Sequence, residues 1–230
     1  MKENKDLFHD LLLKFHIKGV LENVILIGSW VLPIYRHYFS NSPAIPILRT
    51  TDVDFLIPNP PNITNKIDVP KILKDFDFEE QFSLIGGYTK FVHPDLEIEF
   101  LIPEIGRSKN KAVLISEFKV TAQPLRYLYF IQNHILTINY NDIKIRVPEP
   151  TVFVLFKFLL TIKRKDSDKI RKDLKTAVEL TDFLMTKPNQ VEKFRDIYSK
   201  MPKPWQKKLN QIISNHSPDL FAILSNTVFH

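Results

Sequence analysis

The sequence predicts an α/β (α+β) fold in which a mixed sheet is flanked by helices and followed by a C-terminal helical region. Short apolar stretches bounded by Gly, Pro or Asn occupy the first part of the chain and are typical of strands. After Pro148-Glu149-Pro150 the apolar residues recur at helical spacing instead. We therefore expect an α/β core over residues 1–148 and a helical region over 149–230, packed on the core.

Helices and strands alternate in the first half of the core. We expect a helix over 5–19, a strand over 23–27, a helix over 30–39, a strand over 53–57 and a short helix within 67–78. Proline is tolerated only in the first turn of a helix. Pro33 therefore indicates that the second helix begins no earlier than about residue 30.

Two hairpins and a further strand complete the core. The first hairpin, over 82–92, turns at Gly86-Gly87, and the second, over 139–147, turns at Asn141-Asp142. The strand over 96–102 alternates strictly, with Leu96, Ile98 and Phe100 on one face and Glu97 and Glu99 on the other. The helices expected after the boundary span 151–165, 169–186, 190–199 and 204–215.

The composition of the 230 residues excludes several kinds of site. Because the chain has no cysteine, disulfides, thiolate catalysis and Cys-type zinc sites are excluded, and a reducing cytoplasm is favoured. The first residues carry mixed charge, unlike a secretory signal, and the longest apolar run, 151–162, is far shorter than a membrane span. We expect a cytoplasmic protein with no membrane partner; no oligomeric state follows from the sequence.

Part of the positive charge lies near the start of the helical region. The formal net charge is +6, and residues 163–175 hold seven Lys or Arg against three Asp. A basic surface attracts nucleotides or nucleic acid. The plainer interpretation of such a run is a solvated helix face.

Three carboxylates are the candidate chemistry of the chain. Asp52 and Asp54 lie two apart on one strand and therefore project to the same side. Their repulsion is relieved if a divalent cation lies between them, and Mg²⁺ binds through one or two carboxylates together with substrate phosphates. Glu99, from a later strand, would complete a site for two magnesium ions of the kind that serves in-line phosphoryl displacement. Glu97 lies on the same face and is the alternative third acid.

Gly28-Ser29 is the candidate phosphate site. A strand that ends in Gly-Ser and turns into a helix presents backbone N–H groups and the positive end of the helix dipole. Each feature also has an ordinary interpretation: a helix N-cap for Gly28-Ser29, a strand edge for Asp52 and Asp54, and a solvated strand face for Glu97 and Glu99. Their order along the chain is more specific than any one of them.

This order resembles the nucleotidyltransferase superfamily, whose signature is a strand, Gly-Gly or Gly-Ser, a helix, Asp-x-Asp or Asp-x-Glu on the next strand, and a third acid on a later strand. The matching residues are Ile27-Gly28-Ser29-Trp30 and Arg49 to Ile57, and the resemblance covers residues 20–185. The chain is also similar to a bacterial group of nucleotidyltransferase-like proteins. That narrower similarity rests on Ala122 to Leu128, Val147 to Pro150, Lys157 and Arg171 to Leu174.

The resemblance implies a polymerase-beta-like nucleotidyltransferase fold and transfer of a nucleoside monophosphate from an NTP to a hydroxyl acceptor by a two-metal mechanism. It implies that Asp52, Asp54 and Glu99 are the catalytic residues and the ligands of two magnesium ions. The residues that would bind the nucleotide are Gly28, Ser29, Arg49, Lys157 and Arg164. The acceptor stays open among RNA, a protein and a small molecule, and the identity of the NTP stays open as well.

Two residues depart from the family pattern. Glu99 stands where the third acid is expected to be Asp, so we expect a changed metal geometry or a loss of activity. Pro33, in the helix after Gly28-Ser29, is expected to alter the phosphate turn. The alternative function is therefore a non-catalytic nucleotide- or RNA-binding module that retains the fold. A weaker third interpretation is a purely structural partner protein.

Two basic residues have competing interpretations. Lys157 lies in an apolar helix and shares a face with Thr161 and Arg164, so this stripe is expected to face the carboxylates and contact a triphosphate. The alternative is a lysine whose head group reaches solvent along an apolar surface. Arg49 lies just before the aspartate strand, where it would pair with Asp52 or reach a phosphate.

Overall fold

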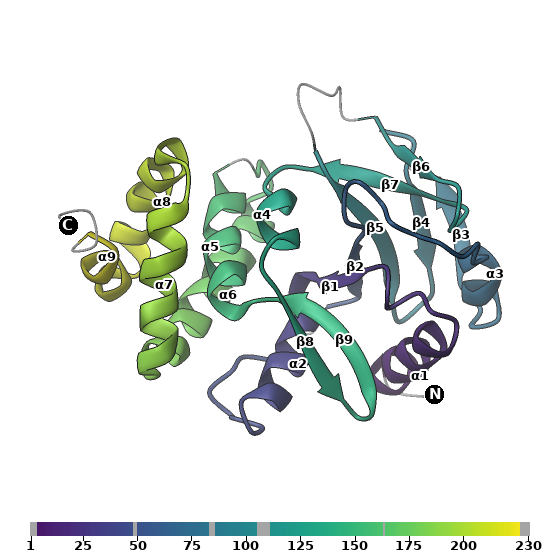
Figure 1. Cartoon of the computed structure of the whole chain (residues 1–230), viewed down its shortest axis with the longest axis horizontal. Helices are drawn as coiled ribbons and strands as arrows, with labels where there is room; N and C mark the ends of the chain where they lie inside the picture. Colours follow the sequence, from purple (N-terminus) through teal and green to yellow (C-terminus); the bar gives the residue numbers. More distant parts are fainter. Residues whose placement is uncertain (1–3, 48–49, 83–85, 105–110, 163, 226–230) are drawn as a thin grey trace. The chain divides into compact units, whose positions relative to one another are not determined.

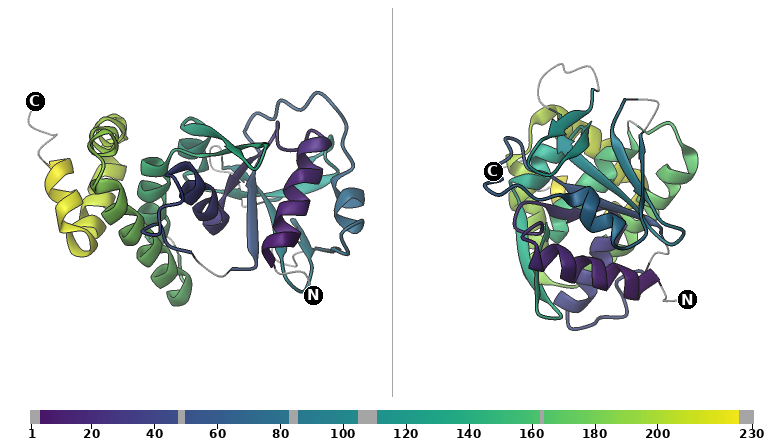
Figure 2. Two further views of the ribbon diagram at one scale, coloured as in Figure 1. Left: turned by 90° about the horizontal axis from the view of Figure 1, so that it is seen from below. Right: turned by 90° about the vertical axis from the view of Figure 1, so that its right-hand side faces the viewer.

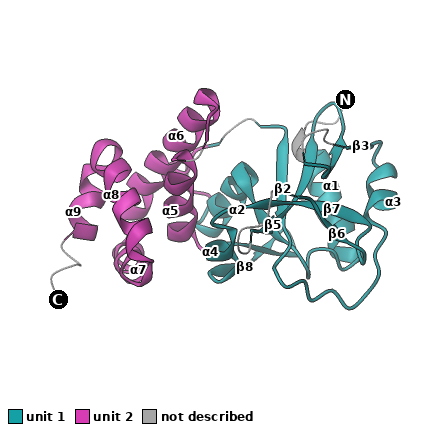
Figure 3. Ribbon diagram, turned by 90° about the horizontal axis from the view of Figure 1, so that it is seen from above, with its two compact units in different colours: residues 1–40, 47–148 teal, residues 41–46, 149–230 magenta. Residues whose placement is uncertain are grey.

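The computed structural model describes residues 4–47, 50–82, 86–104, 111–162 and 164–225 (Figure 1). The chain divides into two compact units, Met1–Ser40 with Ile47–Pro148 and Asn41–Pro46 with Glu149–His230 (Figure 3). The first unit contains helices and a mixed sheet, whereas the described part of the second is helical. The predicted α/β fold class, with a helical region following the sheet, is confirmed.

A mixed sheet lies at the centre of the first unit, and the described residues contribute seven strands to it. Five strands follow the order β1-β2-β5-β4-β3, and β7 pairs with both β5 and β6. The β2–β5 and β5–β7 pairs are parallel, and the remaining pairs are antiparallel. The strands are β1 (Ile25–Ile27), β2 (Asp52–Leu56), β3 (Glu79–Phe82), β4 (Thr89–Val92), β5 (Glu97–Pro103), β6 (Val113–Ile115) and β7 (Val120–Leu125). This order makes β2 and β5, the two strands of the predicted carboxylates, direct neighbours.

One face of this sheet packs against helix α1 (Asn4–Ile17), which runs alongside the strands in Figure 2. The ring of Phe55 on β2 lies 5.5 Å from that of Phe15 on α1 and 5.9 Å from that of Phe100 on β5. Phe91 of β4 meets Phe100 edge-on, and all four rings are buried. Since side chains alternate along a strand, Asp54 and Glu99 point to the opposite face.

Short helices connect the strands of the first unit. One turn of 3-10 helix, η1 (Gly28–Trp30), leads from β1 into α2 (Val31–Tyr38), so Pro33 falls in the first turn of α2 as expected. Helix α3 (Val69–Lys74) follows β2 and is capped by Asp68, whose carboxylate accepts a hydrogen bond of 3.0 Å from Lys71 N. Helix α4 (Leu128–Gln132) follows β7.

A separate hairpin is the last part of the first unit. Strands β8 (Ile135–Tyr140) and β9 (Ile143–Pro148) are antiparallel, and Asn141 and Asp142 at their turn have φ angles of 48° and 64°. Positive φ at both central residues is what a tight type I′ turn requires, and Asn and Asp tolerate it. The predicted hairpin is confirmed. The Tyr35 hydroxyl donates a hydrogen bond of 2.7 Å to Pro148 O and so ties α2 to the end of β9.

The first predicted hairpin differs in detail. Strand β3 begins at Glu79, earlier than expected, and its described residues pair with β4 up to Phe82 opposite Thr89. Residues 83–85, expected in the first strand, lie outside the described residues.

Strand β7 was not predicted, because Pro124 argues against a central strand. Pro124 is accommodated because β6 pairs only with residues 120–122, so that this end of β7 is paired with β5 alone.

The second unit is built around helix α5 (Pro150–Thr161), in which every residue is buried. Helices α6 (Ser167–Met185), α7 (Pro188–Lys200) and α8 (Lys203–His216) pack against it, and α9 (Pro218–Ser225) packs against α7 and α8. The Glu149 side chain caps α5 by accepting a hydrogen bond of 2.8 Å from Thr151 N. In the described part of the chain, no helix combines the length and apolar character needed to cross a membrane.

Candidate active site

The predicted carboxylates lie in register on two adjacent strands. The parallel pairing of β2 with β5 places Asp52 opposite Glu97 and Asp54 opposite Glu99. Residues directly opposite each other point to the same face of a sheet. Asp52, Asp54, Glu97 and Glu99 therefore share the face turned away from the phenylalanine core, which we call the acidic face. The expectation that both aspartates and Glu99 lie on one side of a single sheet is met; their catalytic roles stay predictions.

Gly28 turns the chain directly beside Asp54. Its neighbour Ile27 pairs with Asp54, and the φ angle of Gly28 is +71°, which favours glycine. A Cβ at this position would run into Oδ2 of Asp54 and lie 3.1 Å from its Cγ. Glycine is therefore needed twice here, for the backbone conformation and for the close approach of the carboxylate.

The turn at Gly28-Ser29 also presents backbone donors. Among the described residues, no side chain caps the N-terminus of η1 or of α2. Backbone N–H groups at the start of a helix attract anions. The predicted phosphate site at Gly28 and Ser29 and the carboxylate of Asp54 are therefore adjacent.

A lysine that the sequence pattern did not single out lies on the acidic face. Lys90 of β4 is directly opposite Glu99, and its Nζ forms ion pairs with both Glu97 and Glu99. The side chains of Lys90, Glu97 and Glu99 are 28%, 28% and 18% exposed. The alternation of Thr89, Lys90 and Phe91 gave a local signal that Lys90 lies on the polar side of its strand. Only the strand order shows that this strand adjoins β5.

The environment shifts the pKa values of this cluster. Burial raises the pKa of the Glu99 carboxyl, Lys90 lowers it and Glu97 raises it again, and the net pKa is above the ordinary value. Burial lowers the pKa of Lys90, but its hydrogen bonds to Glu97 and Glu99 outweigh this and raise the pKa above its usual range. Lys90 is thus held as an ammonium ion that balances part of the charge of the acidic face.

The two aspartates fit a divalent cation better than Glu99 does in this arrangement. Asp52 is exposed and Asp54 half-buried, and together with nucleotide phosphates they would supply the oxygen ligands that Mg²⁺ prefers. Glu99 instead holds the ammonium group of Lys90. Over the described ranges, no three His, Asp or Glu side chains are grouped closely enough to hold a metal ion. As a metal ligand, Glu99 would have to share its carboxylate with Lys90.

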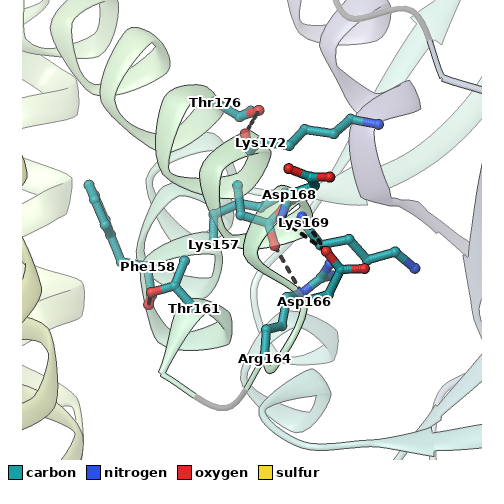
Figure 4. Close-up of polar contacts among 10 residues, drawn as sticks. Lys157, Phe158, Thr161, Arg164, Asp166, Asp168, Lys169, Lys172 and Thr176 are labelled. Carbon is teal, nitrogen blue, oxygen red and sulfur yellow. Dashed lines mark hydrogen bonds and ion pairs between the residues drawn. The ribbon is translucent and has the colours of Figure 1, made fainter.

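The predicted cations of the helical region share one carboxylate. Nζ of Lys157 lies 2.7 Å from Oδ1 of Asp173, and Nε of Arg164 lies 3.0 Å from Oδ2. The side chains of Lys157 and Asp173 are only 6% and 5% exposed. The Thr161 hydroxyl donates a hydrogen bond of 2.8 Å to Phe158 O of its own helix (Figure 4). The partner described for the two cations is therefore Asp173 of α6, and the nucleotide-binding role of Lys157 and Arg164 stays a prediction.

Asp173 could have been found from the sequence. It lies at helical spacing with Ala177, Leu180 and Leu184, all of them buried. A carboxylate on such a face requires a charged or hydrogen-bonding partner. Lys157, embedded in the apolar helix just before, is a complementary residue. Arg49, the remaining predicted phosphate contact, lies outside the described residues.

Comparisons with known proteins bear on the same residues. A family model described as "Nucleotidyltransferase" matches residues 7–201, a span that includes Gly28, both aspartates and Glu99. No match is found among curated protein sequences.

Solved structures provide a further comparison. The chain is similar to an antigenic nucleotidyltransferase-like protein from Paracoccidioides brasiliensis, with a TM-score of 0.53 and 17% identity over 96% of this chain and 93% of that chain. Because the sequence identity is only 17%, this similarity supports the fold alone. The antibiotic-resistance factor ANT(2'')-Ia aligns over 97% of this chain and 89% of its own with 9% identity, but its TM-score of 0.35 is too low to support any conclusion. Because the family model covers most of its length, this chain belongs to a nucleotidyltransferase family.

Proposed function

We propose that the protein transfers a nucleoside monophosphate from an NTP to a hydroxyl acceptor and that Asp52, Asp54 and Glu99 are its catalytic carboxylates. The observation that carries this proposal is the in-register placement of the three acids on one face, beside the turn at Gly28. Membership in a nucleotidyltransferase family supports the reaction type.

In the proposed reaction, the acceptor oxygen attacks the α-phosphorus of the NTP. The bond from that phosphorus to the oxygen leading to the β-phosphate breaks, and pyrophosphate leaves with the electron pair. The proton of the acceptor hydroxyl passes to a carboxylate of the acidic face, a role that we assign to Glu99. Two magnesium ions, when bound, would neutralise phosphate charge and lower the pKa of the acceptor hydroxyl.

The phosphates are proposed to lie against Gly28 and Ser29. Backbone N–H groups at a helix start act on phosphate oxygens without a charged side chain. Arg49, Lys157 and Arg164 are proposed as further nucleotide contacts on the strength of the sequence resemblance. For Lys157 and Arg164 this requires that the phosphates compete with Asp173, which engages both.

A specific observation favours the alternative of a nucleotide- or RNA-binding module without catalysis. Glu99 is paired with Lys90, so the third acid is engaged in an internal ion pair. A protein that keeps Gly28, Asp52 and Asp54 but not a usable third acid would still bind a metal-bound nucleotide. The cytoplasmic location expected from the absence of cysteine is part of either proposal.

Label transfer tests the proposal and identifies the acceptor. The purified protein is incubated with Mg²⁺, cell lysate and each of the four NTPs in turn, labelled at the α-phosphate. Label that wild-type protein, but not Asp54→Asn, attaches to RNA, to a protein or to a small molecule would support transfer. Mg²⁺-dependent NTP binding without transfer to any fraction would favour the binding module instead.

A further inference from the structure

We propose that helices α7, α8 and α9 form a groove that binds single-stranded nucleic acid and that this strand is the acceptor in the transfer. The residues that line the groove all belong to the second unit, so binding uses neither the carboxylates nor the turn at Gly28. The acceptor role rests on the proposed function, whereas binding of the strand does not.

The excess positive charge of the chain belongs to its helical part. Residues 149–230 hold fifteen Lys or Arg against nine Asp or Glu, whereas residues 1–148 hold seventeen of each, so the whole net charge of +6 lies after residue 148. Within the helical part, residues 197–218 contain four lysines and no acidic residue. A surface of this kind attracts polyanions.

The lysines of α8 lack the carboxylate partners that those of α7 have. Both lysines of α7, Lys193 and Lys200, form ion pairs with carboxylates. In the described part of the chain no carboxylate pairs with a lysine of α8, and two of these lysines, Lys203 and Lys207, are exposed. Their charge is therefore available to an anion from outside the protein.

Both exposed lysines line a pocket of about 490 Å³. Lys203, Lys207, Gln211 and Ser214 follow one another at helical spacing and form its wall on α8. Helix α9 packs against α7 and α8 (Figure 1), and its half-buried Phe221 lines the pocket as well. The volume is within the range of pockets that hold small ligands and is sufficient for about one nucleotide of a strand.

Internal hydrogen bonds hold the polar wall of this pocket in place. Gln206 is 5% exposed, and its Nε2 donates hydrogen bonds of 3.0 Å to Tyr198 O and 2.9 Å to Met201 O. Its Oε1 accepts a hydrogen bond of 3.3 Å from Nζ of Lys203. The Tyr198 hydroxyl donates a hydrogen bond of 2.6 Å to Oδ1 of Asn210. Lys203 and Asn210 are thereby oriented before a ligand arrives, which lowers the entropic cost of binding.

These groups match the parts of a nucleic-acid strand. The ammonium groups of Lys203 and Lys207 would bind backbone phosphates. The amides of Asn210 and Gln211 both donate and accept hydrogen bonds, as base edges require, and the ring of Phe221 offers a stacking surface. An acidic peptide would use the lysines alone. A single strand is favoured over a duplex because the bases of a duplex are already stacked on one another and cannot reach Phe221.

Fluorescence anisotropy of labelled single-stranded RNA and DNA tests the groove without NTP or Mg²⁺. The double variant Lys203→Gln with Lys207→Gln should weaken binding by about tenfold or more at low salt. It should also reduce the slope of log affinity against log salt by about 1.4, since each phosphate contact on a single strand contributes about 0.7. Of the two strands, the one that binds more tightly at equal sequence is identified as the ligand.

Phe221 is tested separately from the charges. Phe221→Leu should weaken binding by about fivefold or more and leave the salt slope unchanged, because it removes a stacking ring and no charge. Phe221→Tyr retains the ring and should bind as wild type does. Thermal melting establishes that each variant is folded.

A matched variant removes the same charge elsewhere in the second unit. Lys169→Gln with Lys175→Gln neutralises two exposed lysines of α6 and should change affinity by no more than about twofold. A loss equal to that of the groove variant would mean that diffuse charge attracts the strand, and would overturn the groove. Duplex RNA or polyglutamate that binds as tightly as the single strand would overturn it as well.

Label transfer from NTP tests the acceptor role. The variant Lys203→Gln with Lys207→Gln keeps the acidic face, so it should retain NTP binding but label nucleic acid at about a tenth of the wild-type rate or less. Labelling of a protein or a small molecule at the wild-type rate would overturn the acceptor role and leave the proposed function intact. Tight binding of the strand without transfer to any fraction would instead overturn the proposed function and leave the groove intact.

Discussion

Gly28 and Asp54 are so close that the position of a Cβ on Gly28 is already taken by the Asp54 carboxylate. Glycine at this position lets the chain turn from β1 into η1 directly over the aspartate strand. The contact joins the predicted phosphate site to the predicted metal site. It is also the part of the site that a single methyl group would disrupt.

We therefore predict that Gly28→Ala destabilises the protein by about 2 kcal/mol or more and removes nucleotide binding, because positive φ and the clash with Asp54 act together. Urea unfolding and NTP titration measure the two effects. Gly87→Ala is the matched control, since Gly87 has a φ of +70° but its added Cβ would meet nothing within 4 Å. Equal losses of stability in the two variants would mean that the Asp54 contact contributes nothing.

The aspartates are predicted to serve function rather than stability. Asp52→Asn and Asp54→Asn should each lower nucleotidyl transfer by about 100-fold or more, because each removes charge from the acidic face. Without metal, both variants should melt at the wild-type temperature or slightly above it, since repulsion between carboxylates is relieved. A large drop in melting temperature in both would instead identify them as structural ion-pair partners.

Lys157 is predicted to contribute to stability through Asp173. Lys157→Met leaves a carboxylate in the interior with Arg164 as its described cationic partner, and should lower the free energy of unfolding by about 3 kcal/mol. The double variant Lys157→Met with Asp173→Leu should recover much of that loss. Lys175→Ala, which breaks the exposed pair with Glu179, should change stability by less than about 0.5 kcal/mol.

This prediction separates two accounts of Lys157. The sequence pattern led to the expectation that Lys157→Met weakens NTP binding more than it weakens the fold. The buried pair with Asp173 leads us to expect a larger effect on the fold than the sequence pattern suggests. Unchanged unfolding together with a clear loss of NTP affinity would restore the nucleotide-binding account.

The features that could be predicted from the sequence are those that depend on residues close together in the chain. Asp52, Asp54, Glu97 and Glu99 could be assigned to strand faces because alternation along a strand depends only on neighbouring residues. The turn at Asn141-Asp142 was predictable for the same reason, since the turn type demands residues that tolerate positive φ.

Pairing between elements limited the rest of the prediction. Lys90 joins the acidic face because β4 pairs with β5 across the short connection from Val92 to Glu97, a hairpin that the sequence analysis did not identify. Helix α5 is buried over its whole length, so its apolar residues give no directional pattern that would indicate which side of Lys157 meets α6. The burial of Asp173 could be inferred from its spacing on α6, but its pairing with Lys157 depends on how the two helices pack.

The central claim is that Asp52 and Asp54, beside Gly28, bind a metal-bound nucleotide. Because this step needs no acceptor, calorimetric titration of each NTP with Mg²⁺ into wild-type protein and into Asp54→Asn tests it most directly. The account predicts saturable binding of at least one NTP by wild-type protein, weakened about tenfold or more by the substitution or by withholding Mg²⁺. Equal affinity in both proteins, with and without Mg²⁺, would contradict it.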